Sequence, residues 1–533
     1  MTLSLCTTSC KSVWFEKEIE IYAHGDIHGR FFGKDYINGE ATASSLSHIY
    51  GYVKSRRDSI GKENILFLDL GDHNHGDNAA YYFNNVHKYE HNEDHLYPRI
   101  ANFAGYDAAI VGNHDIEAGR EALDKIARQL EFPYLAGNLS DSLGNLFEDY
   151  TIIEKGGLKI AVIGFTTPAA EKWIGSEKKR GINFTPIHKL AQNSVNKVIE
   201  KEKPDLTILA IHAGTGNGDS TNHENPGLYL AKSIKGADII LTAHDHKSYN
   251  NNVKSKDSVL VINSGEWGKK LARINIGVTR KFGKITALKY KPELVDCTVL
   301  SPDSSFDNHF ENEYYAVKEF SNKNLGISDR DIAPGKILEG SCTYSNLLHY
   351  VQLKKSGADI SFVSPTKFRG TIPAGNINYN TVLQMYPFEN ILYTVSLTGK
   401  QIKHYLELCC SDYDENGKYK GNPARFDCAG GLNYTVDCTK PVGERIQIHS
   451  LQNGKTFSEN KRYSIAMVSY RANGGGDILT QATGYPVKKL EELVLCKHGD
   501  VRELIYQFFL SGKKVSEIEN FSTWKLISSC SVQ

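Results

Sequence analysis

Five short polar clusters in the first half of the sequence contain side chains that can bind metal ions. Imidazole, carboxylate and amide groups are ligands of first-row divalent metals, and neighbouring glycines let the backbone turn so that such side chains point at one centre. Any one cluster alone is more typical of a turn or a helix cap, but five in series predict a metal centre. The clusters are Gly25-Asp26-Ile27-His28-Gly29, Gly71-Asp72-His73-Asn74, Gly112-Asn113-His114-Asp115, Ile211-His212-Ala213-Gly214 and Ala243-His244-Asp245-His246.

Each cluster closely follows a short apolar run of the kind that forms a buried strand. Such runs alternate with helix-like stretches from about residue 18 to residue 294, which is typical of a layered α/β domain. Ligand sites of such folds commonly lie at the carboxyl ends of the strands. The predicted strands are residues 19–23, 65–70, 108–111, 159–163, 206–211, 239–241 and 259–262.

The size and charge of the chain limit the substrates that we expect. At 533 residues the chain exceeds the size at which one hydrophobic core stops growing, which predicts two domains. Lysine plus arginine and aspartate plus glutamate each number 62, so no basic excess is present to bind a nucleic acid polymer or an anionic membrane. No stretch approaches the roughly 18 to 20 apolar residues of a membrane span. The ten cysteines lack zinc-finger spacing, and we interpret most of them as ordinary thiols.

The sequence divides into four parts. Residues 1–17 are a tail or the remainder of an export signal, and Leu3-Ser4-Leu5-Cys6 is similar to a lipoprotein cleavage site, which leaves a lipid anchor open. Residues 18–300 form the first domain, 301–323 a linker helix with apolar residues at helical spacing, and 324–533 a second domain of mixed α and β structure. The apolar positions of the linker are Phe306, Phe310, Tyr314, Val317 and Phe320.

In order and separation the five clusters resemble the signature of the calcineurin-like metallophosphoesterases, although Ala243 stands where the last motif usually has glycine. The resemblance implies a four-layer αββα domain with two divalent metal ions that hydrolyses phosphate esters. Manganese, zinc, iron and cobalt all suit these ligand types. Carried over motif by motif, the ligands are Asp26, His28 and His246 for one metal and Asn113, His212 and His244 for the other, with Asp72 bridging the two.

The same resemblance implies a catalytic role for His114. An imidazolium beside the attacked phosphorus can stabilise developing charge and protonate the leaving oxygen. Glu117, three residues later, stands where related enzymes have a carboxylate or amide that orients this histidine. The alternative is that Glu117 is a solvated glutamate at the start of a helix.

Beyond residue 324 the sequence resembles the C-terminal substrate-binding domain of the 5′-nucleotidase family. The markers are residues 369–375, Tyr386-Pro387-Phe388-Glu389-Asn390, Leu397-Thr398-Gly399 at a helix start, and residues 470–477. Several stretches are most similar to the 2′,3′-cyclic-nucleotide 2′-phosphodiesterase/3′-nucleotidases within that family. They are residues 352–361, 399–408, 439–446 and 470–476, together with Glu224-Asn225.

This second resemblance also implies a set of substrate-binding residues. An aromatic pair can hold a nucleobase, because every base offers a face for stacking. Phe426 and Tyr470 are the candidates, and Gly474 and Gly475 would let the backbone approach the nucleoside. Arg369 and Asn390 fall at positions that resemble substrate contacts. Alternatively, Tyr470 is a core aromatic that ends a strand over residues 463–468, and Arg369 is an ordinary surface arginine.

The leading hypothesis is a hydrolase that opens 2′,3′-cyclic nucleotides to 3′-nucleotides and then releases phosphate and a nucleoside. One alternative is a 5′-nucleotidase or UDP-sugar hydrolase with the same fold and metals. Another is a nucleotide-binding surface protein without enzymatic activity. The resemblance implies a periplasmic, cell-surface or extracellular location, although no complete signal peptide is visible. The sequence makes no prediction about the oligomeric state.

Overall fold

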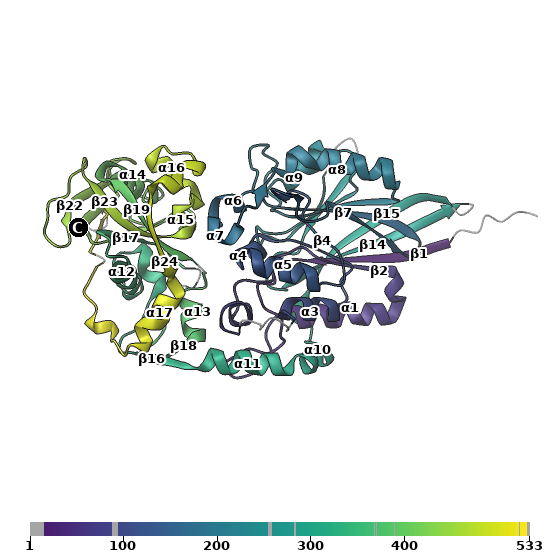
Figure 1. The fold of residues 1–533 in the computed structure, drawn as a ribbon, viewed down its shortest axis with the longest axis horizontal. Helices are drawn as coiled ribbons and strands as arrows, with labels where there is room; N and C mark the ends of the chain where they lie inside the picture. The colour runs from purple at the N-terminus through teal and green to yellow at the C-terminus, as the bar shows by residue number, and fades with distance from the viewer. Residues whose placement is uncertain are drawn as a thin grey trace, which may run out of the picture.

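In a computed structural model the protein forms two halves that lie side by side, joined along one edge by helix α11 (Glu311–Asn322) (Figure 1). Residues 1–14, and with them the possible lipoprotein cleavage site, lie outside the described part of the chain. Within the described part, no helix has both the length and the apolar character needed to cross a membrane. The described residues are 15–87, 94–253, 258–281, 284–366, 368, 370–388, 390–521 and 523–529.

Two six-stranded sheets pack face to face in the N-terminal half. Their facing sides form one core, in which Ile21 and Leu66 of the first sheet and Ile160 and Ile208 of the second are fully buried. The first sheet has the order β15-β14-β1-β2-β3-β4 and the second β12-β13-β11-β10-β8-β7. The bounds are β1 Phe15–His24, β2 Ile65–Asp69, β3 Ala108–Ile110, β4 Tyr134–Leu135, β7 Tyr150–Lys155, β8 Leu158–Thr166, β10 Leu206–His212, β11 Ile239–Thr242, β12 Tyr249–Val253, β13 Val259–Asn263, β14 Lys270–Lys281 and β15 Lys284–Asp296.

Helices cover the outer faces of both sheets. Leu46 and Ile100 lie in the core outside the first sheet, and Val195 and Leu230 lie in the core outside the second. The predicted four-layer αββα architecture is therefore confirmed. The covering helices are α1 Leu46–Ile60, α3 Leu96–Ala104 and α5 Arg120–Gln129 on one side, and α8 Ile187–Glu202 and α9 Gly227–Ser233 on the other.

All seven strands predicted from apolar runs are present. Strands β1, β2 and β3 are parallel neighbours, as are β10 and β11, so their carboxyl ends share one edge of the two sheets. The long antiparallel hairpin of β14 and β15 was not predicted, because its residues alternate between polar and apolar types instead of forming an apolar run. The five polar clusters are thereby brought to one edge.

Two helices occupy the segment that was predicted as one linker helix. They are α10 (Ser304–His309) and α11 (Glu311–Asn322), with Phe310 at the break between them. Phe306 and Phe310 lie in the core of the N-terminal half, whereas Phe320 lies in the core of the C-terminal half. The amphipathic pattern thus reflects packing against both halves.

A five-stranded sheet of order β20-β17-β23-β19-β24 forms the centre of the C-terminal half. The predicted helix start at Gly399 is confirmed, since the Thr398 side chain accepts a hydrogen bond from the Gln401 backbone nitrogen at 3.2 Å. The strands are β17 Ile360–Val363, β19 Ile391–Thr398, β20 Cys428–Gly430, β23 Arg462–Val468 and β24 Val494–Asp500; smaller sheets contain β16 Asn324–Ser328, β18 Gly375–Asn378, β21 Leu432–Asp437, β22 Ile446–Leu451 and β25 Lys525–Ile527. The helices are α12 Thr343–Ser356, α13 Tyr379–Met385, α14 Gly399–Cys409, α15 Ser469–Ala472, α16 Ile478–Thr483 and α17 Val501–Leu510.

Candidate metal centre and substrate cleft

Five of the seven predicted metal ligands occupy strained backbone positions near the ends of the central strands. Nine non-glycine residues of the described chain have positive φ angles, and five of them belong to the predicted ligand set. A side chain held in this region costs on the order of 1 kcal/mol or more, so the surrounding structure must stabilise it. Such concentration is typical of functional sites. The five are Asp26, His28, Asp72, His244 and His246.

Three predicted ligands, Asp26, His28 and His246, converge on one point. Nδ1 of His28 donates to the carbonyl oxygen of His75 at 2.9 Å, which leaves the lone pair on Nε2. The Nε2 atoms of His28 and His246 lie 2.9 Å apart, and Oδ1 of Asp26 lies 3.4 Å from Nε2 of His246. Burial lowers the pKa of His28 to about 4, so the imidazole is held in the neutral form that binds metals. A metal cation suits this position, because it can accept the lone pairs of both imidazole nitrogens and of the carboxylate oxygen.

The second group consists of Asp72, Asn113, His212 and His244. Nδ1 of His212 donates to the carbonyl oxygen of Leu70 at 2.7 Å, and this contact directs Nε2 into the site. That Nε2 lies 3.1 Å from Oδ2 of Asp72 and 3.1 Å from Oδ1 of Asn113. Asp72, His212 and His244 also form a group of donor atoms close enough to share one ion.

The buried carboxylates fit two cations. Oδ1 of Asp26 and Oδ2 of Asp72 are buried and receive no hydrogen bond from described residues outside the predicted ligand set. Burial disfavours an ionised Asp72, but His212 and His114 outweigh it and hold its pKa well below the usual range. An ionised carboxylate between the two groups of nitrogen donors suits a ligand shared by two metals.

His114 lies beside this centre and is paired with Glu117. Nδ1 of His114 is 2.6 Å from Oε2 of Glu117, and Nε2 is 4.0 Å from Oδ2 of Asp72. Burial would lower the pKa of His114, but the charges of Glu117 and Asp72 outweigh it and raise the pKa to about 10. The structure therefore places Glu117 against the imidazole and holds His114 protonated, as proton donation requires.

Several supporting residues were not identified from the sequence. Oδ2 of Asp115 accepts hydrogen bonds from the backbone nitrogens of Asp72 at 3.1 Å and Gly112 at 2.8 Å, and so ties two ligand loops together. Oε2 of Glu266 lies 2.9 Å from Nδ1 of His246. The ring of His75 stacks on that of His114 at 4.2 Å between centroids. Asp115 falls within one of the five clusters, but no sequence pattern points to Glu266 or His75.

A cleft of about 1110 Å³ separates the metal side from the C-terminal half. Its N-terminal wall includes His28, His114 and His246, and its C-terminal wall includes Asn390 and Tyr470. Tyr470 is 38% exposed, so it is not a core aromatic. Oδ1 of Asn390 accepts a hydrogen bond from the Tyr470 backbone nitrogen at 3.4 Å, which fixes the start of α15.

Three of the predicted substrate contacts do not line the cleft. Phe426 is buried at 1% exposure and packs against aromatic side chains, with its ring centroid 6.0 Å from that of Tyr413. Gly474 and Gly475 also lie outside the lining, and a Cβ at Gly475 would meet the Tyr470 ring at 2.5 Å. Gly475 therefore makes room for the ring of Tyr470.

Four other aromatic residues of the C-terminal half do line the cleft: Phe368, Tyr386, Phe388 and Tyr393. These residues, and not Phe426, are therefore the candidates for the second aromatic ring of the predicted stacking pair. Arg369 lies outside the described residues.

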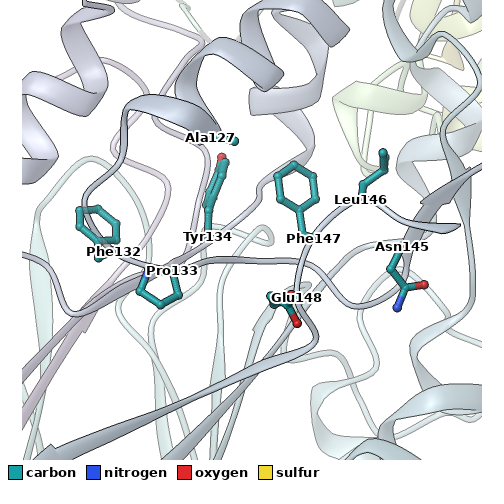
Figure 2. A pocket seen from close by; sticks show the side chains of 8 residues that line it. All are labelled: Ala127, Phe132, Pro133, Tyr134, Asn145, Leu146, Phe147 and Glu148. Carbon is teal, nitrogen blue, oxygen red and sulfur yellow. The ribbon is translucent and has the colours of Figure 1, made fainter. Parts of the chain in front are cut away.

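A second hollow of about 570 Å³ lies on the N-terminal half (Figure 2). The rings of Phe132, Tyr134 and Phe147 stand around it, and none of the predicted metal ligands lines it. The hydroxyl of Tyr134 donates to Oδ2 of Asp115 at 3.2 Å. The residues around this hollow therefore support the loops that carry the predicted metal ligands, through the contact of Tyr134 with Asp115.

Comparisons with known proteins agree with this geometry. Residues 19–248 match the family model of the calcineurin-like phosphoesterases, and residues 323–483 match that of the 5′-nucleotidase C-terminal domain. The chain therefore combines a domain similar to the calcineurin-like phosphoesterases with one similar to the 5′-nucleotidase C-terminal domain, and it is a phosphoric ester hydrolase.

Individual relatives are distant. The trifunctional nucleotide phosphoesterase protein YfkN of Bacillus subtilis is 27% identical, over 93% of this chain but only 38% of that longer protein. A 5′-nucleotidase of Vibrio vulnificus is 25% identical, over 91% of this chain and 90% of its own. A 2′,3′-cyclic-nucleotide 2′-phosphodiesterase/3′-nucleotidase of Salmonella typhimurium is 21% identical, over 86% and 82%.

Among solved structures, a Staphylococcus aureus protein assigned as a 5′-nucleotidase, in complex with α-ketoglutarate, is similar with a TM-score of 0.82. The two chains are 20% identical, and the match covers 96% of this chain and 100% of that one. The similarity shows a common fold over both halves.

Proposed function

We propose that this protein hydrolyses 2′,3′-cyclic nucleotides to 3′-nucleotides and then 3′-nucleotides to nucleosides and phosphate. The observation that carries the proposal is the pair of donor groups facing a cleft that also contains Tyr470, because a phosphate and a base can then be bound at once. The relatives named for nucleotide phosphoesterase and cyclic phosphodiesterase activity support it.

Asp26, His28 and His246 would hold one divalent cation, and Asn113, His212 and His244 the other, with Asp72 shared. When bound, two such cations supply Lewis acidity to the phosphoryl oxygens and lower the pKa of a water molecule. The buried carboxylates then balance the charge of the cations.

His114 would supply the proton that the leaving group needs. As water attacks phosphorus and the bond to the ribose oxygen breaks, Nε2 of His114 donates its proton to that oxygen. Glu117 holds the opposite ring nitrogen at 2.6 Å, which keeps the imidazole protonated and oriented. Tyr470 offers its exposed ring to the base.

A 5′-nucleotidase or UDP-sugar hydrolase is the second candidate. The higher identity of the Vibrio vulnificus 5′-nucleotidase, 25% against 21% for the Salmonella typhimurium cyclic phosphodiesterase, favours it. The same metal ligands, His114 and Tyr470 would serve this reaction, so the two candidates differ in which phosphate bond reaches the metal site: an ester of the 2′-, 3′- or 5′-oxygen of the ribose, or the phosphoanhydride of a UDP-sugar.

The test is phosphate release from 2′,3′-cyclic AMP, 3′-AMP, 5′-AMP and a UDP-sugar by metal-reconstituted protein. An added phosphatase reveals esters that are formed but not released, and Asp72→Ala serves as the control. We expect the first two substrates to be preferred. Preference for 5′-AMP or the UDP-sugar would establish the second candidate instead, and no turnover with any metal would contradict both.

Location outside the cytoplasm also stays a proposal, supported by the family resemblance. Fractionation of cells that produce the full chain tests it, and recovery in the cytoplasmic fraction would contradict it.

A further inference from the structure

A carboxylate that the proposed reaction does not use lies in the cleft beside the metal centre. Glu224 belongs to the loop between β10 and α9 and lines the cleft. Its Oε1 lies 3.1 Å from Nε2 of His244, and 46% of its side chain is exposed. The carboxylate is therefore fixed at one end by a predicted metal ligand while it faces the space where substrate must enter.

The same loop lies close to the element that carries Tyr470. The hydroxyl of Thr167 donates to the carbonyl oxygen of Glu224 at 3.3 Å. Just after Thr167 comes α6 (Ala170–Trp173), which packs across the cleft against α15, the helix of Tyr470. Glu224 thus contacts the predicted metal centre through His244, and its loop adjoins the segment that packs against the helix of Tyr470.

The position of Glu224 matches the sugar of a nucleotide. If phosphate binds at the metal centre and the base stacks on Tyr470, the ribose that joins them lies between the two. A carboxylate accepts hydrogen bonds only, and aspartate or glutamate is a known acceptor for ribose hydroxyls in nucleotide sites. In a 3′-nucleotide the hydroxyl nearest the phosphate is the 2′-hydroxyl.

We propose that Glu224 accepts a hydrogen bond from the 2′-hydroxyl of a 3′-nucleotide and so selects ribonucleotides over 2′-deoxyribonucleotides. This inference rests on the proposed function. A site built to bind a substrate hydroxyl discriminates strongly against the analogue that lacks it, because its polar group is then buried without a partner. A 2′,3′-cyclic nucleotide has no free 2′-hydroxyl, so its hydrolysis does not depend on this contact.

The experiment compares kcat/KM for 3′-AMP, 2′-deoxy-3′-AMP and 2′,3′-cyclic AMP. We expect the wild-type protein to prefer 3′-AMP over its deoxy analogue by about tenfold or more, and Glu224→Ala to reduce that preference to about twofold or less. The loss should appear with 3′-AMP, whereas the other two substrates change by less than about threefold. Glu224→Gln retains a neutral acceptor and should give an intermediate preference.

Glu177→Ala is the matched control, since it removes another exposed carboxylate of the same cleft. It should leave the ribose preference unchanged. Metal content and melting temperature of each variant are measured alongside.

The outcomes separate the two levels of the argument. An equal loss with all three substrates would show that Glu224 acts only on His244, and an unchanged preference in Glu224→Ala would show no contact with the 2′-hydroxyl. Either result overturns the assignment while the proposed function stands. Wild-type protein that hydrolyses 5′-AMP but neither 3′-AMP nor the cyclic nucleotide overturns the proposed function, and the assignment with it.

Discussion

The two walls of the cleft are built in different ways. On the metal side the side chains of Asp26 and Asp72 are almost fully buried, and their backbones are held at positive φ by tight turns. On the opposite wall Tyr470 presents an exposed ring above the buried ion pair of Arg471 and Asp427, whose Nε and Oδ2 atoms lie 2.9 Å apart. On the metal side, activity therefore depends on individual ligand atoms, whereas on the opposite wall the position of Tyr470 depends on the buried ion pair beneath it. Substitutions on the metal side should therefore reduce activity, whereas substitutions on the opposite wall should reduce stability or the affinity for the base.

The largest effect on activity is expected from Asp72→Asn. Asparagine tolerates positive φ and can still accept the hydrogen bond from the His114 backbone nitrogen, which Oδ1 of Asp72 accepts at 2.8 Å. The negative charge between the donor groups is lost, so kcat/KM should fall on the order of a thousandfold.

The fold of this variant should remain intact, because the new amide can donate to Nε2 of His212. Melting temperature of the metal-depleted protein checks this, and Asp124→Asn is a control at a carboxylate that is 37% exposed. Activity within a few-fold of wild type would mean that Asp72 is not a shared ligand.

Arg471→Met tests the supporting network of the other wall. Arg471 is 1% exposed and donates to both carboxylate oxygens of Asp427, at 2.9 and 3.1 Å. Removal of one member of a buried ion pair leaves the other charge uncompensated and costs roughly 3 to 5 kcal/mol of folding free energy. Chemical denaturation followed by hydrogen exchange in the C-terminal half measures this loss.

The comparison for Arg471 is Lys403→Met, which breaks the exposed ion pair with Glu459. Exposed pairs contribute little, so this variant should retain most of the stability. Equal losses in the two variants would contradict the distinction between the buried network and the surface.

Glu117→Gln should have a smaller effect, and one that depends on the leaving group. The glutamine no longer stabilises the imidazolium of His114, so proton donation weakens and kcat for nucleotides should fall about a hundredfold. p-Nitrophenyl phosphate has an acidic leaving group that needs little protonation, and its turnover should fall much less. Similar losses with both substrates would assign Glu117 a structural role only.

The metal side could be predicted from the sequence far better than the opposite wall. Each predicted ligand lies within a few residues of a strand end. An apolar run that predicts the strand therefore also predicts that the ligand after it, such as Asp26 or His212, lies at the shared edge of the sheets. Phe426 was misplaced because its burial is decided by packing against Tyr413 and Trp524, which are distant from it along the chain or belong to another element. Which aromatic residue faces the cleft is a property of tertiary packing that local spacing does not encode.

The smallest effect is expected from Tyr470→Ala, and it should appear in KM. Stacking of a base on an aromatic ring contributes about 1 to 3 kcal/mol, which corresponds to roughly a five- to hundredfold change in affinity. The metal side is untouched, so turnover of ribose phosphates without a base should stay near the wild-type value. Tyr470→Phe keeps the ring and should behave as wild type. If Tyr470→Ala impaired ribose phosphates as much as nucleotides, the ring would support the shape of the cleft and would not bind the base.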